Sequence, residues 1–108
     1  MSTQQIKRAK RLAEILGIDD LEERDGRLLH MASDGPLSIM PVGEFNPEQD
    51  KALLWDLMLK YHLIVNHDGI VINKSHTVNR MFFNERDIPA ALIDCVIEIN
   101  GGYDAARN

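Results

Sequence analysis

The sequence predicts an α+β protein with three helices and a small, mostly antiparallel sheet. Three segments repeat apolar residues at helical spacing, and the stretches between them hold short apolar runs bounded by turn residues, as strands do. The element order is therefore helix, strands, helix, strands, helix. A length of 108 residues is enough for one core, so we expect a single domain over residues 1–108.

The first helix is predicted over residues 2–16. Ser2 and Gln5 have the spacing of a capping box, and Gly17 is suited to end the helix. The face opposite its apolar stripe is basic, with Lys7, Arg8, Lys10 and Arg11. We interpret this face as solvated rather than as a nucleic-acid site, because the chain has a net charge of −5 and no aromatic residue lies among these cations.

An acidic connection follows over residues 18–27, and Asp25 with Gly26 indicates a turn within it. Two interpretations are open. The segment is either a solvated loop or a negative patch that binds a basic surface, such as that of a nucleic-acid-binding protein. The five carboxylates of this patch are Asp19, Asp20, Glu22, Glu23 and Asp25.

Two strands are predicted next, over about residues 28–32 and 37–42. They form a hairpin through the turn residues 33–36, which include a glycine and a proline. Because Pro41 has no backbone N–H, we expect the second strand to lie at the edge of a sheet or to end there.

The second helix is predicted over residues 47–61, with Asn46 as its N-cap and Pro47 as its first residue. It is apolar around most of its circumference, which is typical of a helix buried on more than one side. In one interpretation it lies between the sheet and another helix of this chain. In the other, Trp55 and Leu59 contact a second subunit or a partner, which the enrichment of tryptophan at interface hot spots favours.

The second half of the chain is completed by three strands and a helix. The strands are predicted over about residues 63–66, 70–73 and 78–83, and the Asn-His-Asp-Gly turn between the first two indicates a hairpin. The helix is predicted over residues 88–100, with Pro89 in its first turn and two glycines after its end.

Few groups in the sequence indicate catalysis. Cys95 lies within the apolar arc of the last helix, so we expect a buried and inert thiol. There is no nucleophile elbow, phosphate-binding loop or paired Glu/His helix motif, and we predict no catalytic residue, cofactor or metal site. The alternative is a small metal-dependent enzyme in which His62, His67 and His76 hold a metal ion, with Asp68 as an oxygen ligand.

The expected location is the cytoplasm. No apolar run approaches the roughly 20 residues of a membrane span, and no signal peptide is evident. A single cysteine excludes an internal disulfide and is typical of a reducing compartment.

The capped start Asn46-Pro47 leads into an apolar helix with a tryptophan, then a short strand pair, then the helix start Ile88-Pro89-Ala90-Ala91-Leu92. This order of features, over residues 45 to about 102, resembles the phage ABA-sandwich domain family, which includes small nin-region-like proteins of lambdoid phages. The acidic segment and the stretch around Gly35-Pro36 depart from it. The resemblance implies an α-β-α sandwich, an origin in a phage or prophage, and a small accessory role without catalytic residues. It also implies that the cytoplasm is that of a bacterial host cell.

The favoured hypothesis is an accessory protein that is not an enzyme and that binds another macromolecule. Trp55 and Leu59 then provide the apolar contacts and the acidic patch provides the charged ones. The expected partner is a protein, in the sharper version a basic host protein of defence or nucleic-acid binding that is inhibited, and neither nucleic acid nor membrane is bound directly. The alternatives are a structural homodimer and the metal-dependent enzyme.

Overall fold

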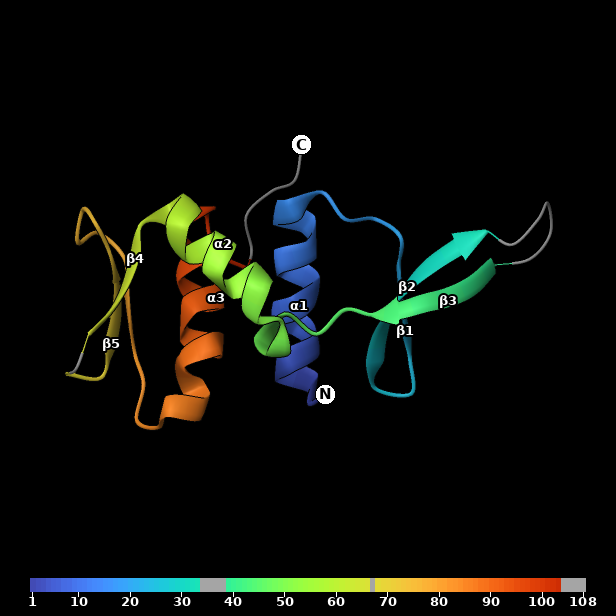
Figure 1. Ribbon diagram of the computed structural model, residues 1–108, viewed down its shortest axis with the longest axis horizontal. Helices are drawn as coiled ribbons and strands as arrows, with labels where there is room; N and C mark the ends of the chain where they lie inside the picture. Colours follow the sequence, from blue (N-terminus) through green and yellow to red (C-terminus); the bar gives the residue numbers. More distant parts are fainter. Residues whose placement is uncertain (34–38, 67, 104–108) are drawn as a thin grey trace. The chain divides into compact units, whose positions relative to one another are not determined.

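The computed structural model of the protein describes residues 1–33, 39–66 and 68–103 (Figure 1). It confirms the α+β class, with three α-helices and antiparallel strands in these residues. The strands form two three-stranded sheets, ordered β1-β2-β3 and β4-β5-β6, where the sequence predicts one sheet. The predicted domain contains two compact units, Met1–Asn46 and Pro47–Asn108, which are described separately. The α-β-α layering stays a prediction.

The first unit begins with helix α1 (Thr3–Leu16), within one residue of the predicted bounds. Its capping box is complete: the Gln5 N–H donates to Ser2 Oγ at 3.2 Å, and the Ser2 N–H donates to Gln5 Oε1 at 2.7 Å. Gly17 ends the helix with a φ of 77°, the left-handed conformation that glycine adopts at little cost.

The acidic connection is not a loop, which corrects the first interpretation of residues 18–27. It contains strand β1 (Leu21–Arg24), which pairs antiparallel with β2 (Arg27–Ser33). Asp25 and Gly26 form the two-residue turn between them, with φ of 51° and 74°. Two positive φ angles are what a type I′ hairpin turn requires, and an Asp-Gly pair is one of its preferred sequences.

Strand β3 (Ile39–Glu44) completes this sheet at its edge, as Pro41 predicts. Residues 37 and 38 of the predicted strand lie outside the described residues, as do the turn residues 34–36. The pairing of β2 with β3 shifts register between His30 and Met31, so the sheet carries an irregularity there.

The second unit begins with a 3₁₀ turn, η1 (Pro47–Gln49), before helix α2 (Lys51–Tyr61). The N-cap of α2 is Asp50, whose Oδ1 accepts the Leu53 N–H at 3.1 Å, so the predicted cap at Asn46 is wrong. Pro47 starts the short 3₁₀ turn, and the α-helix begins after Asp50, whose carboxylate accepts a backbone N–H of the first helical turn.

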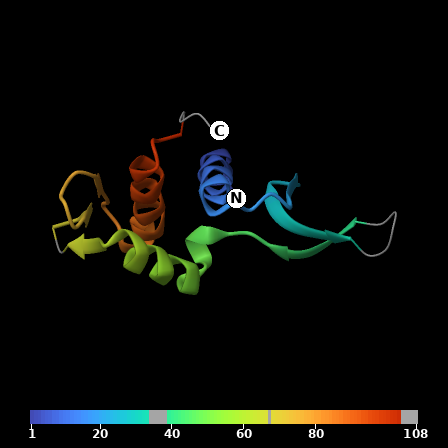
Figure 2. The same ribbon diagram turned by 90° about the horizontal axis from the view of Figure 1, so that it is seen from above.

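Strands β4 (Leu63–Asn66) and β5 (Ile70–Asn73) have the predicted bounds, while β6 (Asn79–Met81) is shorter than predicted. A second 3₁₀ turn, η2 (Glu85–Asp87), precedes helix α3 (Ile88–Ile99). Helix α3 packs against all three strands of this sheet and against α2 (Figures 1 and 2).

Helix α3 provides the core of the second unit. Ile93, Cys95 and Val96 are fully buried, and Val71 on the central strand β5 is buried against them. Helix α2 contributes Leu57, which is 2% exposed. No helix in the described part of the chain is both long and apolar enough to cross a bilayer.

Candidate functional site

Trp55 and Leu59 lie on the solvent-exposed face of α2. Their exposed fractions are 59% and 58%, whereas Leu54 and Leu57 on the same helix are 8% and 2% exposed. The interpretation that α2 is buried on both sides within this chain is therefore wrong for the second stripe. A helix face with an exposed tryptophan and leucine one turn apart is available for contact with another molecule.

The acidic patch is partly neutralised by cations of its own unit. Arg24 Nε donates to Glu22 Oε1 at 2.8 Å, and Lys10 Nζ lies 2.6 Å from Glu23 Oε1. The hydrogen bond from Arg24 lowers the pKa of the exposed Glu22 carboxyl below its ordinary value. Asp20 Oδ1 lies 3.6 Å from His30 Nδ1, a pair that attracts only when the imidazole is protonated.

Asp19 and Asp25 differ from these paired acids, because no side-chain cation lies within ion-pair distance of either in the described residues. Asp25 lies in the turn between β1 and β2, and Asp19 precedes β1. The negative charge of the patch therefore comes mainly from Asp19, Asp20 and Asp25.

The histidines predicted as an alternative metal site do not form one in the described residues, where no three His, Cys, Asp or Glu side chains are placed to hold a metal ion. His62 follows α2 and His76 lies between β5 and β6. His67 lies outside the described residues, so its part in that alternative stays a prediction.

His62 adopts a conformation that most residues avoid. It ends α2 with a φ of 54° and a ψ of 46°, and its N–H donates to the Met58 carbonyl. A residue with a Cβ is strained by roughly 1 kcal/mol in the left-handed region, where glycine is the usual choice at a helix end. His76 also has a positive φ, of 58°.

We expect His62→Gly to raise the free energy of unfolding by about 0.5–1 kcal/mol, because glycine removes the strain at the helix end. Urea denaturation followed by circular dichroism measures this change. Lys60→Gly is the control, since glycine inside the last helical turn should lower stability by about 1 kcal/mol. A stability loss in His62→Gly would mean that the imidazole makes contacts that outweigh the strain.

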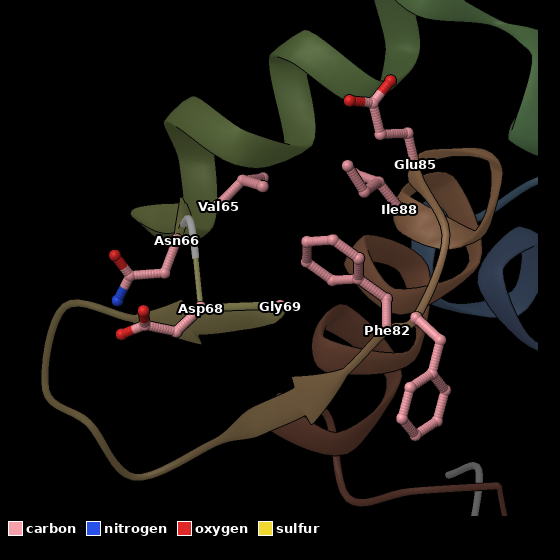
Figure 3. A pocket seen from close by; sticks show the side chains of 8 residues that line it. Val65, Asn66, Asp68, Gly69, Phe82, Glu85 and Ile88 are labelled. Atoms are coloured by element: carbon pink, nitrogen blue, oxygen red, sulfur yellow. The ribbon is translucent and has the colours of Figure 1, made fainter.

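A groove in the second unit, of about 660 Å³, was not predicted from the sequence. Figure 3 shows Val65, Phe82 and Ile88 directed toward one another, with the carboxylates of Asp68 and Glu85 on opposite sides of this apolar centre. Aromatic and aliphatic walls with two flanking carboxylates suit a cationic group with an apolar stem. The groove brings Val65 of β4 together with residues that follow β6 about 20 positions later in the sequence, and no local sequence motif indicates this proximity.

The Cys95 thiol is buried, as predicted. Its exposed fraction is 0%, and Sγ lies 3.7 Å from the carbonyl oxygen of Val71. Burial raises the pKa of this thiol to about 11, so the reactive thiolate is scarce at neutral pH.

The chain was compared with protein-family models, curated proteins and solved structures, and none of these comparisons finds a match.

Proposed function

We propose that this protein acts without catalysis by binding a basic protein, and that Trp55 and Leu59 provide the apolar contact. The observation that carries the proposal is the exposure of both side chains, 59% and 58%, on one face of α2. Truncation of a tryptophan that becomes buried in an interface commonly costs 2 kcal/mol or more of binding energy, so Trp55 is the residue on which affinity should depend most.

Charge supports the choice of a basic partner. The chain has a net charge of −5, which favours encounter with positively charged surfaces over a range set by the ionic strength. Asp19, Asp20 and Asp25 would provide the charged contacts. Glu22 and Glu23 contribute less, because Arg24 and Lys10 already contact their carboxylates.

In its specific form, the proposal describes a phage or prophage accessory protein that inhibits a host protein of defence or nucleic-acid binding. This form depends on the resemblance to the phage ABA-sandwich family and on the acidic character of the chain. The alternative is a structural homodimer in which the exposed stripe of α2 meets a second copy of the chain.

Trp55→Ser is expected to leave the fold intact and to abolish the complex. The exposed indole contributes little to stability, so the free energy of unfolding should change by less than about 1 kcal/mol. The tagged protein and the variant are incubated in parallel with a bacterial lysate at low and high salt. A basic protein retained by the parent chain at low salt, and lost both with Trp55→Ser and at high salt, supports the proposal.

Ile64→Ser is the matched control, because Ile64 is 51% exposed on β4 of the same unit and outside the proposed contact. It should retain the partner. If Trp55→Ser unfolds the protein, the indole is part of the core and the proposal is wrong. If light scattering shows a dimer that Trp55→Ser converts to monomer, the homodimer replaces it.

A further inference from the structure

A pocket of about 580 Å³ in the second unit combines cations with an apolar wall. It lies between the last turn of α2, the start of the loop after β5 and the end of α3. Its lining includes Lys60, Tyr61, His62, Lys74, Ser75 and Ile99.

The strand pairing explains why these residues meet. Leu63 at the start of β4 pairs with Asn73 at the end of β5. The residues that flank this pair, His62 and Lys74, therefore emerge side by side at one end of the hairpin. Lys60 lies in the last turn of α2, which ends directly before His62, so Lys60 lies at the same end of the hairpin.

The two lysines of the pocket have no carboxylate partner in the part of the chain that the structure describes. No carboxylate lies within ion-pair distance of Lys60 or Lys74 among the described residues, and the pocket lining includes no acidic side chain. Several other cations of this acidic chain do contact carboxylates, among them Lys10, Arg11, Arg24, Arg27 and Arg80. The pocket is thus a local concentration of uncompensated positive charge on a chain of net charge −5.

Hydrogen bonds fix the framework that carries the lysines. On the helix side, Asn100 Nδ2 donates to the Tyr61 hydroxyl at 3.2 Å, and Lys60 Nζ lies 5.5 Å from the centroid of the Tyr61 ring. On the loop side, Asn73 Nδ2 donates to Ser75 Oγ at 3.1 Å. A framework held in this way reduces the ordering cost of binding.

We infer that this pocket binds a phosphate-bearing small molecule with a planar apolar part, the chemistry of a mononucleotide. Lys60 and Lys74 would bind the phosphate oxygens as point charges, which is a common role of lysine. His62 adds a ring N–H beside them, in the strained conformation that is often found at functional sites. Tyr61 and Ile99 provide the apolar wall. The inference does not depend on the proposed binding of a basic protein.

The test is calorimetric titration of the full chain with three probes: adenosine 5′-diphosphate, inorganic phosphate and adenosine. We expect saturable binding of the diphosphate at one site, competition by inorganic phosphate, and much weaker binding of adenosine. Affinity should fall as salt is added, because the lysines are exposed and their charges are screened.

Lys60→Glu/Lys74→Glu should lower the affinity for the diphosphate at least about tenfold, because two attractive charges become repulsive. If the two glutamates disturb folding, Lys60→Gln/Lys74→Gln replaces that variant. It should also lower the affinity for the diphosphate, because both positive charges are removed. Lys51→Glu is the matched control, since Lys51 begins the same helix, about 13 Å from Lys60 at 1.5 Å per residue. The Lys51→Glu variant should bind the diphosphate with the affinity of the parent chain. Trp55→Ser should do the same, which would separate this pocket from the proposed protein-binding face.

Three outcomes would overturn the inference. One is the absence of saturable binding of both the diphosphate and phosphate. Another is an equal loss of affinity in Lys51→Glu and in the double variant, which would indicate a general charge effect. The last is adenosine binding as tight as that of the diphosphate, which would assign the pocket to an apolar ligand.

Discussion

Asn73→Ala is expected to lower the free energy of unfolding of the second unit by about 3 kcal/mol, because it removes the side chain that organises the loop between β5 and β6. The Asn73 side chain is 8% exposed and makes four hydrogen bonds within this loop. Oδ1 accepts the N–H groups of Thr77 and Val78, both at 3.0 Å. Each bond contributes about 1 kcal/mol, and an unsatisfied group costs more where water does not replace the partner.

The same loop also depends on the backbone of Asn73. Its N–H donates to the Val78 carbonyl at 3.2 Å, and its carbonyl accepts the His76 N–H at 3.0 Å. These bonds remain in the alanine variant, so we expect the strands to persist while the loop loosens. Lys74 begins this loop. The affinity of the basic pocket, the one lined by Lys60 and Lys74, for phosphate should therefore also fall.

Urea denaturation and amide hydrogen exchange at residues 63–81 measure the effect. Asn79→Ala is the control, because Asn79 lies exposed on β6 and its side chain makes no hydrogen bond in the described structure. Its expected change is within about 0.5 kcal/mol. Equal effects of the two substitutions would show that the loop is held by its backbone alone.

The elements that were predicted well are those whose local signals agree with their tertiary contacts. Helix α1 has a capping box at one end and a glycine at the other, and both form as predicted. Strands β4 and β5 are apolar runs separated by a short sequence of turn-forming residues, and their bounds are as predicted. An element can be predicted from the sequence when its local preferences agree with its place in the fold.

The sequence does not predict strand β1, because the residues of this strand do not themselves favour a strand. Leu21–Arg24 contains one apolar residue and two glutamates, which are poor strand formers. Its structure comes from pairing with β2 and from the Asp25-Gly26 turn. The sequence indicates the turn but not the hairpin, because an acidic run is normally typical of a solvated segment.

The candidate sites were less predictable than the fold. A helical wheel places Trp55 on a separate stripe of α2 but cannot say whether that stripe is covered, since coverage depends on elements distant in sequence. The basic pocket joins Lys60 and Lys74 through the pairing of Leu63 with Asn73. Neither lysine belongs to a motif, so only the register of the strands brings them together.

Gly69→Ala is expected to destabilise the second unit by about 2–4 kcal/mol, for two separable reasons. Gly69 has a φ of 81°, a conformation that costs a residue with a Cβ about 1–2 kcal/mol. In addition, a Cβ at this position would lie 2.9 Å from the backbone carbonyl oxygen of Phe82. The Phe82 N–H donates to the Gly69 carbonyl at 2.8 Å, which holds the two segments together and limits how far this oxygen can move from the added Cβ.

Gly102→Ala separates the two causes. Gly102 has a similar φ of 87°, but nothing lies within 4 Å of its added Cβ, so only the conformational cost of about 1–2 kcal/mol is expected. The difference between the two variants in urea denaturation is then the cost of the contact with Phe82. Equal losses would show that the segment carrying Phe82 moves freely away from the turn, and the groove lined by Val65, Phe82 and Ile88 would then be adaptable rather than preformed. A larger loss in Gly69→Ala would instead show that the turn and the segment after β6 that carries Phe82 form one rigid wall of that groove.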